Sequence, residues 1–245
     1  NVIQRLRRQR PRQFVFVAGM QRSGTNMLMD LIERSFATDV YHERDPRAFD
    51  NYRMRERDVI RRLARESCAP FFVIKALCEL DQLGSLMDEF APAKTIWILR
   101  EYGDAVNSAL VSFGNFSKQV ARIAKNRNTD DWRAAGMSEQ THEIVRRHYH
   151  PEIDDVTSAA LIWYLRNVLF FEQSFDRDRR VKLVFYEDLV RDADREARAV
   201  FEFLEIPFSS WITRKVFASS IRKRPPPNID PAVARLCDDL GARFR

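Results

Sequence analysis

The chain has 245 residues, of which 45% are hydrophobic and 31% are charged, and this composition excludes a disordered or collagen-like chain. Apolar runs in the sequence stay far below the ~20 residues needed to cross a bilayer, so we expect no membrane span. Lysine and arginine outnumber aspartate and glutamate by 41 to 35, and the resulting charge of +6 is only weak evidence for an anionic partner.

Residues 1–12 are polar and rich in arginine, which is not the pattern of a signal peptide. The cysteines Cys68, Cys78 and Cys237 are too few and too scattered for a disulfide framework, and no histidine cluster accompanies them as a metal site needs. We therefore expect a reduced, cytoplasmic protein without a bound metal. The chain begins at Asn1, and a segment before it would change this expected location.

Four short apolar runs predict buried strands, because the strands of a parallel sheet are covered on both faces. These predicted strands are residues 14–18, 71–75, 95–99 and 181–185. Apolar residues at helical spacing predict the helices 26–36, 50–67, 80–90, 105–113, 155–175, 191–204 and 210–217. Residues 117–136 are polar with few apolar anchors, which predicts a mobile or substrate-facing segment over 114–137. Repeated strand–helix units favour a single α/β domain over 1–245, with a parallel sheet flanked by helices.

The most informative segment is the loop GMQRSGTN at residues 19–26, inside a strand–loop–helix unit over 13–36. Its two glycines have the spacing of the nucleotide-binding P-loop, G-x-x-x-x-G-K-[ST], but Thr25 and Asn26 replace its lysine and its metal-binding hydroxyl. Such a turn directs backbone N–H groups at an anion, and Arg22 adds a positive charge. We therefore predict an anion site that needs no metal. A tight turn in which the second glycine only saves space is the alternative.

A second candidate anion site lies in the unit over 95–113. Arg100 directly follows the predicted strand, and Ser108 lies eight residues later on the predicted helix. Ligands of parallel sheets bind at the carboxyl ends of the strands. This pair is therefore placed to hold a second phosphate.

Together, the motifs QRSGTN (21–26) and Arg100-x7-Ser108 resemble those of the sulfotransferases that use 3′-phosphoadenosine 5′-phosphosulfate (PAPS). A third segment agrees, because VFYEDL at 184–189 and the helix predicted after it resemble the family's corresponding stretch. The three segments stand in the family's order and span most of the chain. At the position of Arg22, small-molecule members of the family have lysine. An arginine at this position resembles the bacterial, glycan and protein-tyrosine sulfotransferases.

The resemblance implies a P-loop-like sulfotransferase topology and in-line transfer of a sulfuryl group from PAPS to a hydroxyl of a small molecule or glycan. The product is then 3′-phosphoadenosine 5′-phosphate (PAP), and no metal takes part. In the family the first loop binds the 5′-phosphosulfate, the arginine and serine bind the 3′-phosphate, a tyrosine lies near the adenine, and a basic loop covers the 3′-phosphate. The implied donor-binding residues are Arg22, Ser23, Gly24, Thr25, Asn26, Arg100, Ser108, Tyr186, Arg222 and Lys223.

Some of these residues have plainer alternatives. Tyr186 is otherwise an ordinary strand-end tyrosine, and the basic run at 220–224 is otherwise a solvated surface segment.

Sulfuryl transfer needs a cation at the leaving oxygen, by analogy with phosphoryl transfer. The resemblance implies Arg22 for this role, together with Lys75 at the end of the strand predicted over 71–75. A solvent-exposed lysine at a strand end is the alternative for Lys75.

The reaction also needs a general base for the acceptor hydroxyl. Glu43 lies 21 residues beyond Arg22, the separation that the base of protein-tyrosine sulfotransferases has from their loop arginine. Leu77 stands where small-molecule members have their catalytic histidine. His42 is the second candidate for the base. Glu79 and Asp81 rank third as candidates for the base. A surface carboxylate paired with the neighbouring Arg44 or Arg47 is the alternative for Glu43.

Two other functions compete with a sulfotransferase. A degenerate P-loop kinase or NTPase is disfavoured by the missing lysine and by the lack of an acidic strand end for a metal. A basic nucleic-acid-binding module is disfavoured because the aromatic residues fall mostly in buried-strand patterns. We therefore expect no nucleic-acid partner. The sequence indicates neither the acceptor nor the oligomeric state.

Overall fold

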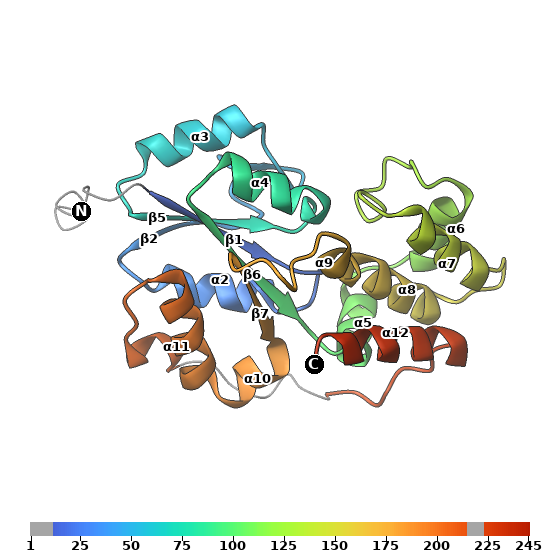
Figure 1. Cartoon of the computed structure of the whole chain (residues 1–245). Coiled ribbons are helices and arrows are strands. Elements are labelled where there is room, and N and C mark those ends of the chain that lie inside the picture. Colours follow the sequence, from blue (N-terminus) through green and yellow to red (C-terminus); the bar gives the residue numbers. More distant parts are fainter. Residues whose placement is uncertain (1–11, 215–222) are drawn as a thin grey trace.

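A parallel sheet forms the centre of the molecule (Figure 1), with the strand order β2-β5-β1-β6-β7. The computed structural model describes residues 12–214 and 223–245. In sheet order the strands are β2 (Thr38–Tyr41), β5 (Phe71–Ala76), β1 (Gln13–Ala18), β6 (Ala93–Leu99) and β7 (Val181–Phe185). The four strands predicted from apolar runs are confirmed, and β2 is an edge strand that the sequence analysis missed.

The side chains of β1 alternate between the two faces of the sheet, and both faces are buried. Phe14 and Phe16 belong to a core that includes residues of α3 and α4, whereas Val15 and Val17 belong to a second core with α2, α10 and α11. These helices are α2 (Thr25–Glu33), α3 (Arg57–Glu66), α4 (Leu83–Glu89), α10 (Tyr186–Arg191) and α11 (Ala193–Leu204). The predicted α/β class, with helices on both faces of a parallel sheet, is confirmed.

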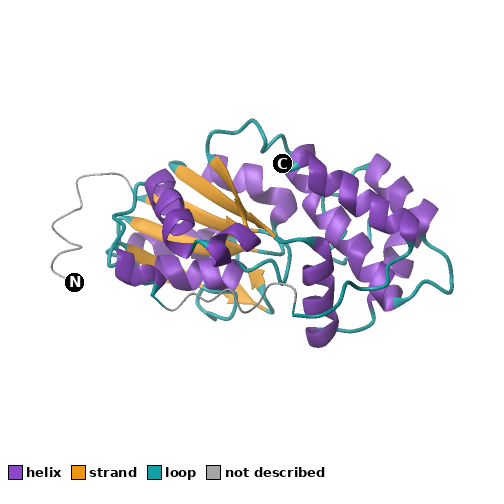
Figure 2. Cartoon of the chain, turned by 90° about the horizontal axis from the view of Figure 1, so that it is seen from below, coloured by secondary structure: helices purple, strands orange, loops and turns teal. Residues whose placement is uncertain are grey.

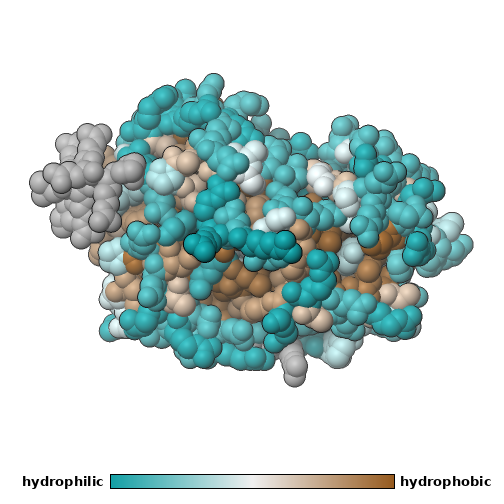
Figure 3. Space-filling model, in the orientation of Figure 1, coloured by the Kyte–Doolittle hydropathy of each residue, from teal (hydrophilic) through white to brown (hydrophobic). Residues whose placement is uncertain are grey.

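A helical part lies beside the sheet (Figure 2) and is built around α8. Its helices are α5 (Tyr102–Ser112), α6 (Phe116–Lys125), α7 (Glu139–His148), α8 (Asp155–Asn167), α9 (Leu169–Glu172) and α12 (Pro231–Arg243). Every residue of α8 from Thr157 onward is buried, as expected of a helix surrounded by others. Among the helices of the described residues, none is long and apolar enough to cross a membrane. The face seen in Figure 1 is hydrophilic over most of its area, with hydrophobic side chains gathered near its centre (Figure 3).

The helix predicted over residues 50–67 is wrong in its first part. The structure places a hairpin there, formed by β3 (Phe49–Asp50) and β4 (Arg53–Met54). The two residues of its turn, Asn51 and Tyr52, have φ angles of 47° and 65°. Positive φ at both central residues is the geometry of a tight hairpin turn, which a helix cannot contain.

The segment over 114–137, predicted to be mobile or to face a substrate, begins with the packed helix α6. Residues Phe116, Val120 and Ile123 are buried on one face of α6, which packs on α8. This spacing of four and three residues is helical, but the polar residues between the anchors mask it. The second part of the segment contains Trp132 and Arg133, which do face the candidate site described below.

Other element boundaries differ less. The region predicted as one helix over 80–90 begins with a 3-10 helix, Leu80–Gln82, and the region over 155–175 divides into α8 and α9. The region over 210–217 forms a 3-10 helix, Ser210–Thr213, and its end lies outside the described residues.

Candidate active site

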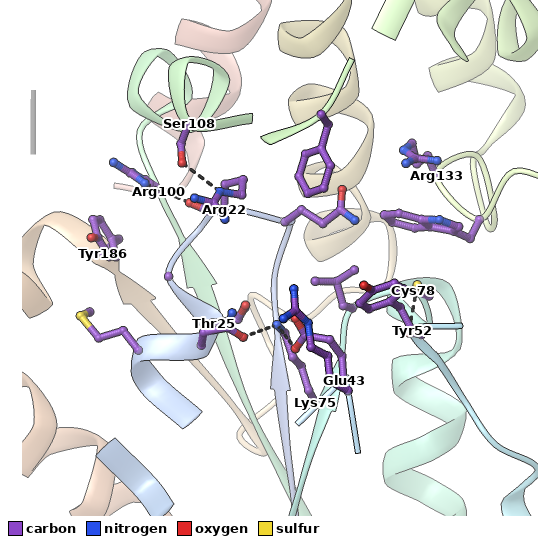
Figure 4. A pocket seen from close by; sticks show the side chains of 18 of the residues that line it. Arg22, Thr25, Glu43, Tyr52, Lys75, Cys78, Arg100, Ser108, Arg133 and Tyr186 are labelled. Carbon is purple, nitrogen blue, oxygen red and sulfur yellow. Dashed lines mark hydrogen bonds and ion pairs between the residues drawn. The ribbon is translucent and has the colours of Figure 1, made fainter. Parts of the chain in front are cut away.

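Each strand of the main sheet delivers a candidate residue at its carboxyl end. In sheet order these residues are Glu43 after β2, Lys75 within β5, Arg22 after β1, Arg100 after β6 and Tyr186 after β7. All of them line one pocket of about 510 Å³ (Figure 4). The order of the strands therefore sets the order of the side chains along the pocket, as expected at the carboxyl edge of a parallel sheet.

The loop after β1 needs its second glycine for two reasons. Gly24 has a φ of 97°, and a Cβ atom added there would lie 2.2 Å from Cδ2 of Tyr186. Only glycine combines this backbone conformation with so close an approach. The alternative of a space-saving glycine is therefore true of Gly24, but the loop also has the features of an anion site.

The amino end of α2 is one of these features. No side chain caps this helix, and its first turn contains no acidic residue. The first N–H groups of a helix have no partner within the helix, and they favour a negative charge. Ser23 precedes the helix, and its buried hydroxyl has no hydrogen-bond partner among the described residues. These groups fit a phosphate or sulfate oxygen.

The two predicted anion motifs meet in the structure although they are 86 residues apart. Nε of Arg22 donates to Oγ of Ser108 over 2.9 Å, and Nη1 of Arg100 donates to the backbone oxygen of Arg22 over 3.1 Å. The guanidinium carbon of Arg100 lies 4.6 Å from the ring centroid of Tyr186. Trp163 on α8 holds the backbone oxygen of Arg100 through a hydrogen bond of 3.0 Å. Arg22, Arg100, Ser108 and Tyr186 thus form one end of the pocket (Figure 4).

The buried Lys75 and the half-buried Glu43 form an ion pair farther along the pocket (Figure 4). The Lys75 side chain is 2% exposed, and its Nζ also donates to Oδ1 of Asn26 over 2.6 Å. Burial lowers the pKa of Lys75, and the hydrogen bond to Glu43 opposes this effect. The alternative of a solvent-exposed lysine is therefore wrong. The alternative partner proposed for Glu43, Arg47, is paired with Asp45 instead.

His42 lies apart from the residues that line the pocket. Its Nε2 is 3.2 Å from Oε2 of Glu33 and 3.9 Å from Oδ1 of Asp30, so the imidazole faces α2. These three side chains are close enough to share a cation, but the two carboxylates are exposed, His42 is half-buried, and all three lie outside the pocket lining.

The remaining candidates also lie outside the pocket lining. An oxygen of Glu79 accepts the N–H of Met54 over 2.8 Å, and burial raises the pKa of Glu79. Asp81 packs against Gly136. Lys223 is exposed, and Arg222 lies outside the described residues.

The end of the pocket away from Tyr186 was largely missed by the sequence analysis. Tyr52, Trp132 and Arg133 line it, and the last two belong to the segment over 114–137 that was predicted to be mobile or to face a substrate. The sequence signal that could have placed Tyr52 in a turn was the preceding residue, Asn51, because asparagine is a common turn former. Of the described residues that line the whole pocket, five are cationic and one is a carboxylate. These are Arg22, Arg44, Lys75, Arg100, Arg133 and Glu43. This balance strongly favours anionic ligands.

The comparisons with known proteins agree with this geometry. A family model described as "Sulfotransferase domain" matches residues 12–224. No curated protein sequence matches the chain significantly.

Several solved structures are similar to this chain. The sulfotransferase domain from the Synechococcus PCC 7002 olefin synthase has a TM-score of 0.60 and 13% identity, and the match covers 96% of each chain. A sulfotransferase from Alicyclobacillus acidocaldarius has a TM-score of 0.51 and 19% identity, covering 96% of this chain and 91% of that chain. Mouse sulfotransferase SULT7A1 complexed with PAP has a TM-score of 0.50 and 16% identity, covering 94% and 84%. At these identities the structures support the fold alone.

Proposed function

The chain belongs to the sulfotransferase domain family, and on this premise we propose that it transfers a sulfuryl group from PAPS to an acceptor hydroxyl. The observation that carries the proposal is the contact between Arg22 and Ser108. It joins the two anion-binding motifs in one pocket with a carboxylate and a buried lysine. PAPS has two anionic ends that match such a pair of sites, the 5′-phosphosulfate and the 3′-phosphate.

The donor would bind with its 5′-phosphosulfate at the loop after β1. The first N–H groups of α2, together with Arg22 and Thr25 of the pocket lining and the buried hydroxyl of Ser23, would hold these oxygens. Arg100 and Ser108 would hold the 3′-phosphate, because both face the same end of the pocket. The mouse relative complexed with PAP supports this choice of nucleotide.

The acceptor would react between this donor site and Glu43. In the transfer step a bond forms from the acceptor oxygen to sulfur, and the bond from sulfur to the phosphate oxygen of the donor breaks. Glu43 takes the proton of the acceptor hydroxyl, and the ion pair with Lys75 orients its carboxylate. Arg22 and Lys75 stabilise the negative charge that develops on the leaving phosphate oxygen.

The NTPase alternative has less support from this geometry. Oδ1 of Asn26, at the position of the metal-binding hydroxyl in a P-loop, accepts a hydrogen bond from Lys75. The Lys75 ammonium therefore occupies the side of the loop where a P-loop enzyme binds Mg²⁺.

Transfer of labelled sulfate from PAPS to a panel of phenols, sugars and aliphatic alcohols tests the proposal. Glu43→Gln keeps the size of the side chain but removes its ability to accept a proton. We expect turnover to fall by roughly 10²–10⁴-fold while PAP affinity stays near that of the parent protein.

The matched control is His42→Ala, which changes the adjacent residue outside the pocket lining. We expect this variant to keep most of its turnover. Normal turnover in Glu43→Gln would remove Glu43 from the mechanism, and a dead His42→Ala variant would transfer the role of the base to His42. Absence of sulfated product from every acceptor would overturn the proposed function itself.

A further inference from the structure

The pocket extends beyond Glu43 to an end that the donor does not require. Tyr52, Cys78 and Arg133 lie at this end, on the side away from Arg100 and Tyr186 (Figure 4). We call it the acceptor end. Its position next to the candidate base is where the non-reacting part of an acceptor would extend.

The first wall of the acceptor end is the tip of the β3–β4 hairpin. Tyr52 adopts a left-handed conformation with a φ of 65°, which is a rare state for a bulky side chain. Its backbone oxygen accepts the Cys78 thiol over 3.5 Å, and its side chain is left 53% exposed. This φ belongs to the tight turn of the hairpin, which fixes the position of Tyr52 at its tip.

A second wall, formed by Trp132 and Arg133, is fixed by the buried Arg166 of α8. Nη1 of Arg166 donates to the backbone oxygen of Trp132 over 2.8 Å. Nη2 of Arg166 donates to the backbone oxygen of Leu77 over 3.0 Å. The guanidinium carbons of Arg166 and Arg133 lie 5.0 Å and 4.5 Å from the ring centroid of Trp132. The wall is therefore part of the packed structure, and its ring is held in place.

Arg133 has bonding capacity that the protein does not use. Its Nη1 donates to Oδ1 of Asp131 over 2.9 Å, and its buried Nε has no hydrogen-bond partner among the described residues. Arg122 also binds Asp131, so two guanidiniums share this one carboxylate and a positive charge remains. Arg44, which lines the same pocket, is exposed and has no ion pair with any residue that the structure describes.

The charges along the pocket divide into two groups. Arg22, Lys75 and Arg100 serve the donor in the proposed function, whereas Arg44 and Arg133 have no role in it. Resting on that proposed function, we propose that the acceptor is a hydroxyl compound with a ring and an anionic group. The ring lies between Tyr52 and Trp132, and Arg133, assisted by Arg44, binds a carboxylate or equivalent anion on the acceptor.

Matched pairs of acceptors test this inference. Each pair consists of a carboxylic acid and its methyl ester, so that the hydroxyl and the ring stay constant. The acid of one pair is 4-hydroxyphenylpropanoate, a phenol. The acid of the other pair is the methyl glycoside of glucuronic acid, a sugar with a free carboxylate. In the preferred pair we expect kcat/KM for the acid to be about ten- to a hundredfold higher than kcat/KM for its ester. This ratio corresponds to the free energy of one charge-assisted hydrogen bond. The preferred pair distinguishes a phenol from a sugar.

Arg133→Gln is the informative variant, and Arg122→Gln is its control. Arg122 contacts the same aspartate but does not line the pocket. We expect Arg133→Gln to remove most of the preference for the acid and Arg122→Gln to keep it, with PAP affinity equal to that of the parent protein in both variants.

The inference is wrong if the esters react as fast as the acids, or if no acid is sulfated while neutral acceptors are. It is also wrong if the preference survives in Arg133→Gln. Failure of the proposed function itself would give a different result. In that case PAP does not bind, and no member of either pair yields a sulfated product.

Discussion

Arg22 has a φ of 69°, a left-handed conformation that costs a residue other than glycine roughly 1–3 kcal/mol. Two contacts hold it there: Arg100 binds its backbone oxygen, and its own Nε reaches Ser108. The strained residue is thus the one that links the two anion motifs. Strain at such a position is consistent with a loop shaped for its ligand.

Arg100→Ala tests the assignment of the 3′-phosphate. A lost charge-assisted contact to a phosphate costs ~1.5–3 kcal/mol, which is about ten- to a hundredfold in affinity. We expect calorimetric titration to show this loss for PAP and a much smaller loss for adenosine 5′-monophosphate, which lacks the 3′-phosphate. The exposed Arg198 on α11 supplies a control, Arg198→Ala. Equal losses for both nucleotides would show that Arg100 only supports the loop through the backbone of Arg22.

Glu187 gives a prediction for the pH dependence of stability. Its side chain is 8% exposed and its Oε1 accepts the N–H of Glu101 over 3.0 Å. Burial raises the pKa of Glu187 above 4.5, so the folded state retains the proton to a higher pH than the unfolded state. The stability linked to this proton is complete below the unfolded pKa and is lost as the pH rises through the folded pKa.

Glu187→Gln keeps an acceptor for the N–H of Glu101 but cannot ionise. The variant should therefore gain thermal stability relative to the parent protein between pH 4 and pH 7. Melting curves across this range check the prediction, and a constant difference in Tm would contradict it.

At the scale of elements, the loop between β1 and α2 depends on the space above Tyr186. Gly24→Ala would place a methyl group 2.2 Å from the Tyr186 ring, at a φ that alanine disfavours. We expect a lower Tm and at least a tenfold weaker affinity for PAP, because the loop and the start of α2 must shift. Gly114→Ala is the control, since no atom lies within 4 Å of the added Cβ. An unchanged PAP affinity in Gly24→Ala would show that the loop does not bind the nucleotide.

Strands buried on both faces could be predicted from the sequence, because continuous apolar runs such as 14–18 carry their own signal. The edge strand β2 could not, since three of its four residues are only half-buried and its sequence TDVY has no apolar run. The hairpin over 49–54 was hidden because the charged residues around it continue into the genuine helix α3. Its turn is determined by two positive φ angles, which composition does not reveal.

The donor end of the site was more predictable than the acceptor end, because its residues lie at the ends of strands that can be recognised from their apolar runs. Arg22 and Arg100 follow strands and Lys75 lies at the end of one, at the carboxyl edge where a parallel sheet gathers its ligands. Tyr52 and Arg133 reach the pocket from a hairpin and from a loop held by Arg166 of α8. These contacts depend on tertiary packing between segments, and no local pattern encodes them.

For the whole molecule, the strand order places the candidate base and the 3′-phosphate site at opposite sides of the β1 loop. Glu43 follows β2 and Lys75 lies in β5 on one side, and Arg100 follows β6 on the other. We expect this arrangement to bind a nucleotide with two separate anionic ends and to need no metal for it.

Thermal unfolding with PAP in the presence of a metal chelator tests this expectation, with Mg²⁺ and ATP as the comparison. At a concentration of PAP near 100 times its Kd, binding adds about 2.7 kcal/mol to the free energy of unfolding, which raises Tm by roughly 5–10 °C for a chain of this size. We predict that PAP gives this shift without metal and that Mg²⁺ with ATP gives a smaller one. A larger shift with Mg²⁺ and ATP, or no shift with PAP, would contradict the assignment of the pocket to PAPS.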